Sequence, residues 1–163
     1  MGGPGKAGGI AVNILLAAVG KSRPGPERDL FEHYRKRLTW TLTLKEVEEK
    51  RPLPAAERML RECALLQAAL PKGAILVALD ERGKSFGSEE FAEKIRNWRD
   101  QGRHELAFVI GGADGHAEPM RQSADLLLSF GQMTWPHMLV RGLLAEQLYR
   151  VESILAGHPY HRV

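Results

Sequence analysis

Two groups of residues in this sequence have types and spacing that suit chemistry on a bound ligand. The first is three loops rich in glycine, serine or aspartate that directly follow apolar runs, at residues 80–87, 111–115 and 129–135. Glycine lets the backbone approach a flat ligand closely and offer it N–H and C=O groups, as the edge of an adenine requires. The second is the polar and aromatic C-terminal tail, residues 158–162. We interpret the loops as a cofactor site and the tail as a substrate site, although Gly111–Gly112 could also simply turn the chain.

Established ligand motifs do not account for these residues. Residues 20–22, Gly-Lys-Ser, resemble the end of a P-loop, but the first glycine of that motif would fall at Leu15. His158 and His161 could bind zinc, yet Pro159 disrupts a helical spacing and the tail contains no cysteine, aspartate or glutamate. We therefore expect no metal.

The elements that must position these groups alternate between strand and helix. Apolar runs and helical stripes predict strands at residues 10–19, 39–46, 74–79, 106–110 and 126–128, and helices at 26–38, 54–70, 88–101, 119–123 and 136–156. This order predicts a parallel sheet with helices on both faces. Ligands of such sheets bind beyond the carboxyl ends of the strands, which is where the three loops fall. Ser88 is expected to cap its helix.

The last predicted helix has a wider apolar stripe than one core-facing side requires. Its apolar residues stand at positions 139, 140, 143, 144, 148, 151, 154 and 155. This width predicts a second contact surface, which we assign to a homodimer. Gly157 is placed as the stop of the helix.

Composition bounds the class of protein. With 163 residues, 44% of them apolar and 26% charged, the chain fits one globular domain, which we place at residues 10–163 after a flexible leader at 1–9. A net charge of +3 and a pI near 9.2 permit an anionic partner such as RNA without requiring one. The single cysteine, Cys63, excludes a disulfide framework and a cysteine metal site, and it favours the cytosol.

The apolar start of the domain has two interpretations. Lys6 followed by the apolar stretch Ile10–Val19 is typical of a secretory signal. The same stretch is typical of a buried first strand, which we favour because glycines bound it on both sides. No other stretch approaches the roughly 18 to 20 apolar residues that span a bilayer, so we expect no membrane partner.

Five blocks of the sequence resemble those of a small SPOUT-class methyltransferase of bacterial ribosomes, the ribosomal RNA large subunit methyltransferase H family. The blocks are VALDERGK at 77–84, VIGGADG at 109–115, TWPHMLVR at 134–141, AEQLYR at 145–150 and HPYHR at 158–162. Their order and spacing match from about Asn13 to the C-terminus. This family methylates N3 of a pseudouridine in 23S rRNA, so the resemblance implies the same activity here, on assembled ribosomes in the cytoplasm.

The resemblance also implies a fold that general rules of chain connection would not predict. It is a SPOUT-type parallel sheet with a C-terminal trefoil knot, S-adenosyl-L-methionine in the knotted loops, and the active site at a homodimer interface. Carried over by position, the cofactor-binding residues are Leu79, Gly111, Gly112, Gly131, Gln132, Met133, Thr134, Trp135 and Pro136. Trp135 and Met138 stand where many relatives have leucine and proline, so the wall around the adenine is expected to differ in shape.

The chemistry of methyl transfer then selects the catalytic candidates. The cofactor sulfonium already carries an activated methyl group, so the enzyme must align the base nitrogen with it and remove the N3 proton. A cation near the base oxygens and a proton acceptor serve that task. The candidates are Arg141, Tyr160, His161 and Arg162, with His161 as the proton acceptor. Phosphate contacts could come from Arg35, Lys36, Arg37, Arg141, Arg150 and Arg162, although the basic run at 35–37 is also typical of a solvated helix face.

Two other classes of protein are weighed against this function. A non-catalytic ribosome- or RNA-binding protein could keep the same fold without methyl transfer. A flavodoxin-like nucleotide enzyme could have the same order of elements without a knot. All three cofactor loops are retained, which argues against the first, and the HPYHR ending argues against the second.

Overall fold

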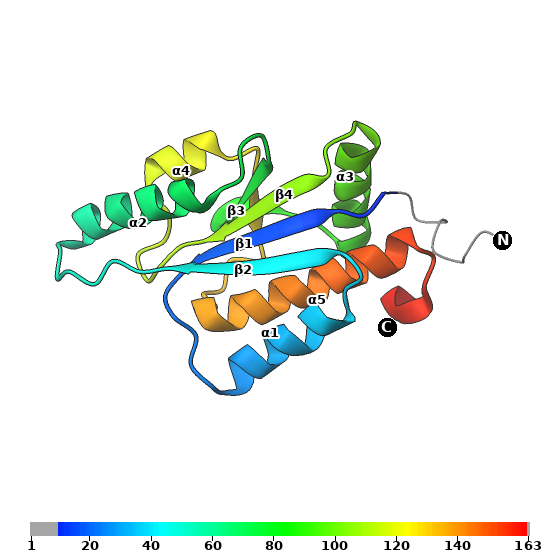
Figure 1. Cartoon of the computed structure of the whole chain (residues 1–163), viewed down its shortest axis with the longest axis horizontal. Helices are drawn as coiled ribbons and strands as arrows, with labels where there is room; N and C mark the ends of the chain where they lie inside the picture. Colours follow the sequence, from blue (N-terminus) through cyan, green and yellow to red (C-terminus); the bar gives the residue numbers. More distant parts are fainter. Residues whose placement is uncertain (1–9, 163) are drawn as a thin grey trace.

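A single parallel sheet forms the centre of the molecule (Figure 1). The computed structural model describes residues 10–162, with side chains up to Tyr160. The five strands lie in the order β2-β1-β4-β3-β5, and every pairing is parallel. Their bounds are β1 Asn13–Val19, β2 Thr41–Val47, β3 Ile75–Ser85, β4 Glu105–Ile110 and β5 Leu126–Ser129. The predicted parallel sheet is confirmed, and the stretch that also resembled a secretory signal forms strand β1, inside the sheet.

Helices cover both faces of the sheet, as the alternating sequence predicted. They are α1 Pro26–Arg37, α2 Ala55–Ala69, α3 Ser88–Asp100, α4 Glu118–Ser123 and α5 His137–Leu155, followed by the short 3-10 helix η2, Pro159–Arg162. Figure 1 shows α2 and α4 above the sheet and α1 and α5 below it. Within residues 10–162, no helix is both long and apolar enough to cross a membrane.

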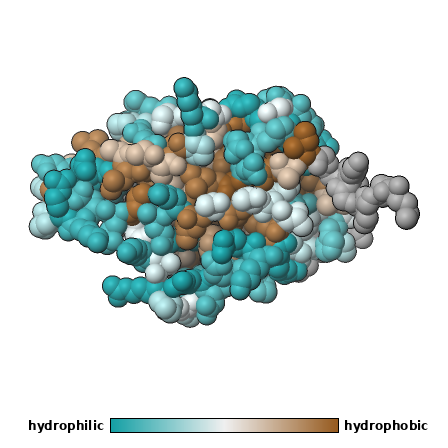
Figure 2. Space-filling view, in the orientation of Figure 1, coloured by the Kyte–Doolittle hydropathy of each residue, from teal (hydrophilic) through white to brown (hydrophobic). Residues whose placement is uncertain are grey.

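The side-chain alternation of a strand explains how one sheet serves two cores. In β1, Ile14, Leu16 and Ala18 pack with α1, α3 and α5, whereas Ala17 and Val19 pack with α2 and α4. Because both faces are covered there, β1, β4 and the first half of β3 read as nearly continuous apolar runs, whereas the edge strand β2, TLTLKEV, alternates. Figure 2 shows the resulting surface, with apolar side chains gathered between the more hydrophilic upper and lower parts of this face.

Two local expectations from the sequence are wrong. Ser88 does not cap α3, because the cap position is Gly87 and Ser88 is the first helical residue. The Ser88 hydroxyl instead donates to Oε1 of Gln147 on α5 at 2.7 Å, and Oε1 of Glu90 accepts the Gly87 N–H at 3.2 Å. The loop expected at residues 80–87 is also largely strand, since β3 continues to Ser85.

The wide apolar stripe of α5 is partly explained within one chain. Leu144, Leu148 and Val151 are fully buried in the core, where α5 packs on α1, α3 and the sheet. The other five apolar positions, 139, 140, 143, 154 and 155, are only partly buried. Gly157 adopts φ +72°, which confirms it as the stop of the helix.

Candidate active site

A cleft lies at the carboxyl ends of β4 and β5 and beside residues 79–82 of β3, where the loops after β4 and β5 meet. Its volume is about 360 Å³. Seven of the nine residues predicted to bind the cofactor line it: Leu79, Gly111, Gly112, Gly131, Met133, Thr134 and Trp135. Gln132 and Pro136 belong to the same loop and are exposed, but they do not line the cleft. The structure therefore brings together most of the predicted residues, and their contact with a cofactor stays a prediction.

The loop after β4 is a tight turn held from behind by α2. Gly112 and Gly115 form an isolated antiparallel bridge, in which the Gly115 N–H donates to the Gly112 carbonyl at 3.0 Å. Arg58 of α2 contacts the carboxylate of Asp114 at 3.4 Å. Glu62, one helical turn further along α2, is buried next to Gly112. Helix α2 thus fixes the backbone that forms one wall of the cleft.

The loop after β5 forms the opposite wall. The Ser129 hydroxyl accepts the Gly131 N–H at 3.0 Å and lies 3.2 Å from the Glu81 carbonyl, so it ties this loop to β3. Gly131 has φ +110°, a conformation that favours glycine. Beyond it, Met133 is 75% and Trp135 42% exposed, unusual for large apolar side chains. Apolar surface is therefore left uncovered at the rim of the cleft.

Charged and titratable side chains that the sequence analysis did not select also line the cleft. Asp80 forms ion pairs with Arg121 at 3.1 Å and with Arg82 at 3.5 Å. His116 is buried, with Nε2 3.2 Å from the Val109 carbonyl, and burial lowers its pKa. Burial and the nearby Arg141 charge lower the pKa of His137. Both imidazoles are therefore mainly neutral at pH 7. His137 lies inside the TWPHMLVR block, which was the only sequence signal for it.

The predicted catalytic residue Arg141 lies away from the lining of the cleft. Its side chain is 2% exposed and pairs with Glu46 at 2.5 Å, and it also donates to the Gly20 carbonyl at 2.9 Å. These contacts join α5 to the carboxyl ends of β1 and β2. In this conformation the guanidinium holds the fold together, and its role toward a substrate stays a prediction.

The tail folds back onto its own chain. The Tyr160 hydroxyl lies 3.1 Å from Oε1 of Glu146 and 3.4 Å from the Tyr34 hydroxyl, and the Arg37 guanidinium lies over its ring at 5.1 Å. Partial burial, together with the hydrogen bonds and the charge of Glu146, raises the pKa of Tyr160. Glu146 is about 14 Å along the axis of α5 from His137 at the usual rise. The side chains of His161 and Arg162 lie outside the described part of the chain.

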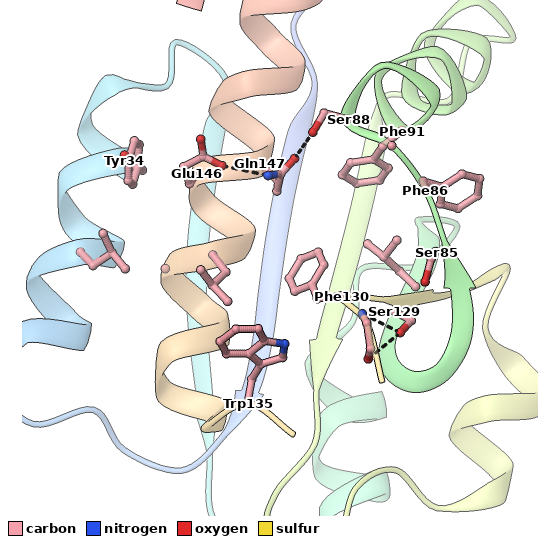
Figure 3. A pocket seen from close by; sticks show the side chains of 16 residues that line it. Tyr34, Ser85, Phe86, Ser88, Phe91, Ser129, Phe130, Trp135, Glu146 and Gln147 are labelled. Atoms are coloured by element: carbon pink, nitrogen blue, oxygen red, sulfur yellow. Dashed lines mark hydrogen bonds between the residues drawn. The ribbon is translucent and has the colours of Figure 1, made fainter. Parts of the chain in front are cut away.

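A second cavity of about 640 Å³ lies between the tail and the cleft (Figure 3). Tyr34 and Glu146, which contact Tyr160, form one end of it, and Trp135 forms the other. It shares Leu128, Phe130, Gly131 and Trp135 with the cleft. The cavity is lined mainly by apolar side chains, so it is suited to a flat or apolar group.

Comparisons with known proteins define the class to which this fold and cleft belong. Residues 12–161 match the family described as "Predicted SPOUT methyltransferase", so the chain belongs to the SPOUT methyltransferase family. This membership excludes the flavodoxin-like alternative. The chain also resembles a solved structure, a probable methylase family protein from Haemophilus influenzae Rd KW20, with a TM-score of 0.52 and 12% identity over 91% of this chain and 69% of that one. At that identity the likeness shows the fold alone.

Curated relatives give a narrower group within the family. The chain is 64% identical to the ribosomal RNA large subunit methyltransferase H of Rhodospirillum centenum, over 93% of this chain and 99% of that protein. It is 61% identical to the protein of the same name from Paramagnetospirillum magneticum, again over 93% and 99%. The family recognised in the sequence blocks is thereby confirmed.

Proposed function

We propose that this protein transfers a methyl group from S-adenosyl-L-methionine to ribosomal RNA of the large subunit. The observation that carries the proposal is the cleft, where the loops after β4 and β5 and residues 79–82 of β3 converge in a SPOUT sheet. The names of relatives at 64% and 61% identity support the substrate class. The finer assignment is N3 of a pseudouridine in 23S rRNA, on assembled ribosomes in the cytoplasm. A non-catalytic RNA-binding role is not favoured, because it gives no reason to keep the cleft.

The residues of the cleft fit a cofactor with a flat apolar part and a polar edge. Leu79, Val140 and Trp135 offer apolar surface, and the glycines of the loops after β4 and β5 offer backbone donors and acceptors. When bound, S-adenosyl-L-methionine supplies the activated methyl group. The loops orient the cofactor and limit access of water, and the substrate base must be held against it in line.

We assign the active site to a homodimer. In one chain Tyr160 reaches the end of the second cavity at Glu146, but it does not line the cleft. The uncovered Met133 and Trp135 and the partly buried Leu143 of α5 offer apolar surface to a second copy. A second copy could thus bring its tail residues to the cleft and cover this surface.

We also propose the C-terminal trefoil knot that the family resemblance implies. The support is a close approach of β5 to the end of β3. Leu128 pairs with Leu79 and again with Lys84, so residues 80–83 have no paired partner on β5 and interrupt the register between the two strands. A side chain at Gly83 would lie 2.5 Å from the Leu127 carbonyl oxygen, so only glycine permits this close approach. This contact supports a loop through which the following segment is threaded.

The test is transfer of a radiolabelled methyl group from the cofactor to 70S ribosomes, isolated large subunits or protein-free 23S rRNA lacking the modification. We expect label in 23S rRNA at a single pseudouridine, with ribosomes as the best substrate. Added S-adenosylhomocysteine should compete and abolish labelling. Cofactor binding without labelling of any rRNA preparation would refute the proposed substrate, and absence of cofactor binding would refute the proposed function.

A further inference from the structure

Glu62 has a buried carboxyl group to which the proposed function assigns no role. It lies on the face of α2 that packs toward the sheet and is 7% exposed. Its Oε1 is buried and has no hydrogen-bond partner among the described residues. A carboxylate removed from water without a partner is costly, so its retention at this place calls for a physical reason.

The position of Glu62 connects it to the cleft through one glycine. A Cβ built on Gly112 would lie 2.8 Å from Oε2 and 3.0 Å from Oε1 of Glu62. Gly112 itself lines the cleft, whereas Glu62 does not. The carboxyl group therefore lies behind a single layer of backbone, and no side chain separates it from whatever binds in front.

The charges around Glu62 compensate the negative charge of its carboxylate only in part. Burial raises its pKa, the charge of Arg58 opposes this shift, and the charges of Asp114 and Glu49 add to it. Arg58 is also shared, because it contacts Asp114 at 3.4 Å and donates to the Leu53 carbonyl at 2.7 Å. A positive charge bound in the cleft would supply the missing compensation, since a low-dielectric surrounding strengthens attraction across a thin layer of backbone.

We propose that Glu62 is a specificity-determining residue that makes the cleft prefer the sulfonium cofactor to its thioether product. The inference rests on the proposed function. During transfer the bond from sulfur to the methyl carbon breaks, its electron pair stays on sulfur, and the methyl carbon bonds to N3 as the N3 proton leaves to a base. Sulfur thereby loses its positive charge. The carboxylate attracts S-adenosyl-L-methionine through that charge and has no such attraction to S-adenosylhomocysteine, which helps the product to leave.

The test compares the affinities of both ligands by calorimetry for the wild type, Glu62→Gln and the matched control Glu57→Gln. Glu57 is an acidic residue on an exposed position of the same helix. In Glu62→Gln we expect the preference for the sulfonium ligand to fall about three- to tenfold, because one of two attracting unit charges is removed in a surrounding of intermediate dielectric. The fall should come from weaker S-adenosyl-L-methionine binding, and the control should keep the wild-type ratio.

The outcomes separate this inference from the proposed function. Equal weakening of both ligands in Glu62→Gln would show a packing role alone and overturn the inference, as would an unchanged ratio. A wild type that binds neither ligand would overturn the proposed function, and the inference with it. If Glu62→Gln does not fold, Glu62→Met is the second neutral variant, because apolar replacement of a buried unpaired charge is commonly tolerated, and the same fall in ratio is expected.

Discussion

The contact between Gly112 and Glu62 leads to a prediction whose magnitude follows from the structure. In Gly112→Ala, the new methyl group would lie 2.8 to 3.2 Å from three atoms of the Glu62 carboxyl group. Ordinary contacts between such atoms are about 3.5 Å or longer. Either the carboxyl group or the turn must therefore shift by several tenths of an ångström. Glu62 is a flexible side chain, but it is buried, so the shift falls partly on the turn that lines the cleft.

Overpacking of this kind costs about 1–3 kcal/mol. If cofactor binding requires the original turn, the same free energy is lost from binding, which corresponds to roughly 5- to 150-fold weaker affinity. Gly112→Val adds two further methyl groups and is expected to abolish binding while the fold is kept. Calorimetry measures the affinity, and far-ultraviolet circular dichroism checks that the fold is intact.

A double-mutant cycle decides whether the contact is the cause. Glu62→Ala removes the carboxyl group and opens the space that the methyl group of Gly112→Ala needs. The double variant should then bind S-adenosyl-L-methionine within a few-fold of Glu62→Ala alone. Losses that simply multiply in the double variant would refute the reasoning, because Gly112 would then be required for something other than clearance from Glu62.

Three further predictions concern the dimer, the tail and the ion pair below α5. Leu143→Glu should give a folded monomer in sedimentation, because this side chain is only partly buried in the chain; a wild-type monomer would contradict the dimer. Deleting residues 158–163 should abolish methyl transfer but keep cofactor binding. Mixed dimers of this deletion variant and a full-length Gly112→Val chain should regain some methyl transfer. Absence of rescue in verified mixed dimers would favour a tail that serves its own chain. Partial burial raises the pKa of Glu46. Hydrogen bonds from Arg141 and the Ser22 N–H, together with the charge of Arg141, outweigh burial and lower this pKa overall. The contribution of Glu46 to the stability of the fold is therefore fully present above its pKa in the unfolded chain, near 4.5. This contribution is lost as the pH falls through the lower pKa that Glu46 has in the folded protein. Glu46→Gln should thus unfold about 1–3 kcal/mol more easily at pH 7, and this difference should shrink in melts at decreasing acidic pH.

The sequence by itself determined the elements, their parallel pairing and the family. Short apolar runs and helical stripes are local patterns, and they located four of the five strands and the five main helices to within a few residues, whereas β3 continues to Ser85, six residues beyond its predicted end. The blocks from VALDERGK to HPYHR identified the family through their residue types, order and spacing. The location of the predicted cofactor loops at one edge of the sheet follows from the parallel pairing, since parallel strands end at the same edge.

Only the tertiary structure shows which side chains are buried or paired and which remain available to a ligand or a partner. Val151 had the same apolar character as Leu143, yet only the packing of α5 on α1 and the sheet shows that Val151 is in the core. Arg141 was selected as catalytic, but the partner that neutralises it, Glu46, is distant in sequence and lies on β2. Glu62 gave no sequence signal, because an acidic residue on a helix is ordinarily solvated. Burial and pairing depend on which elements meet, and no local pattern encodes that meeting.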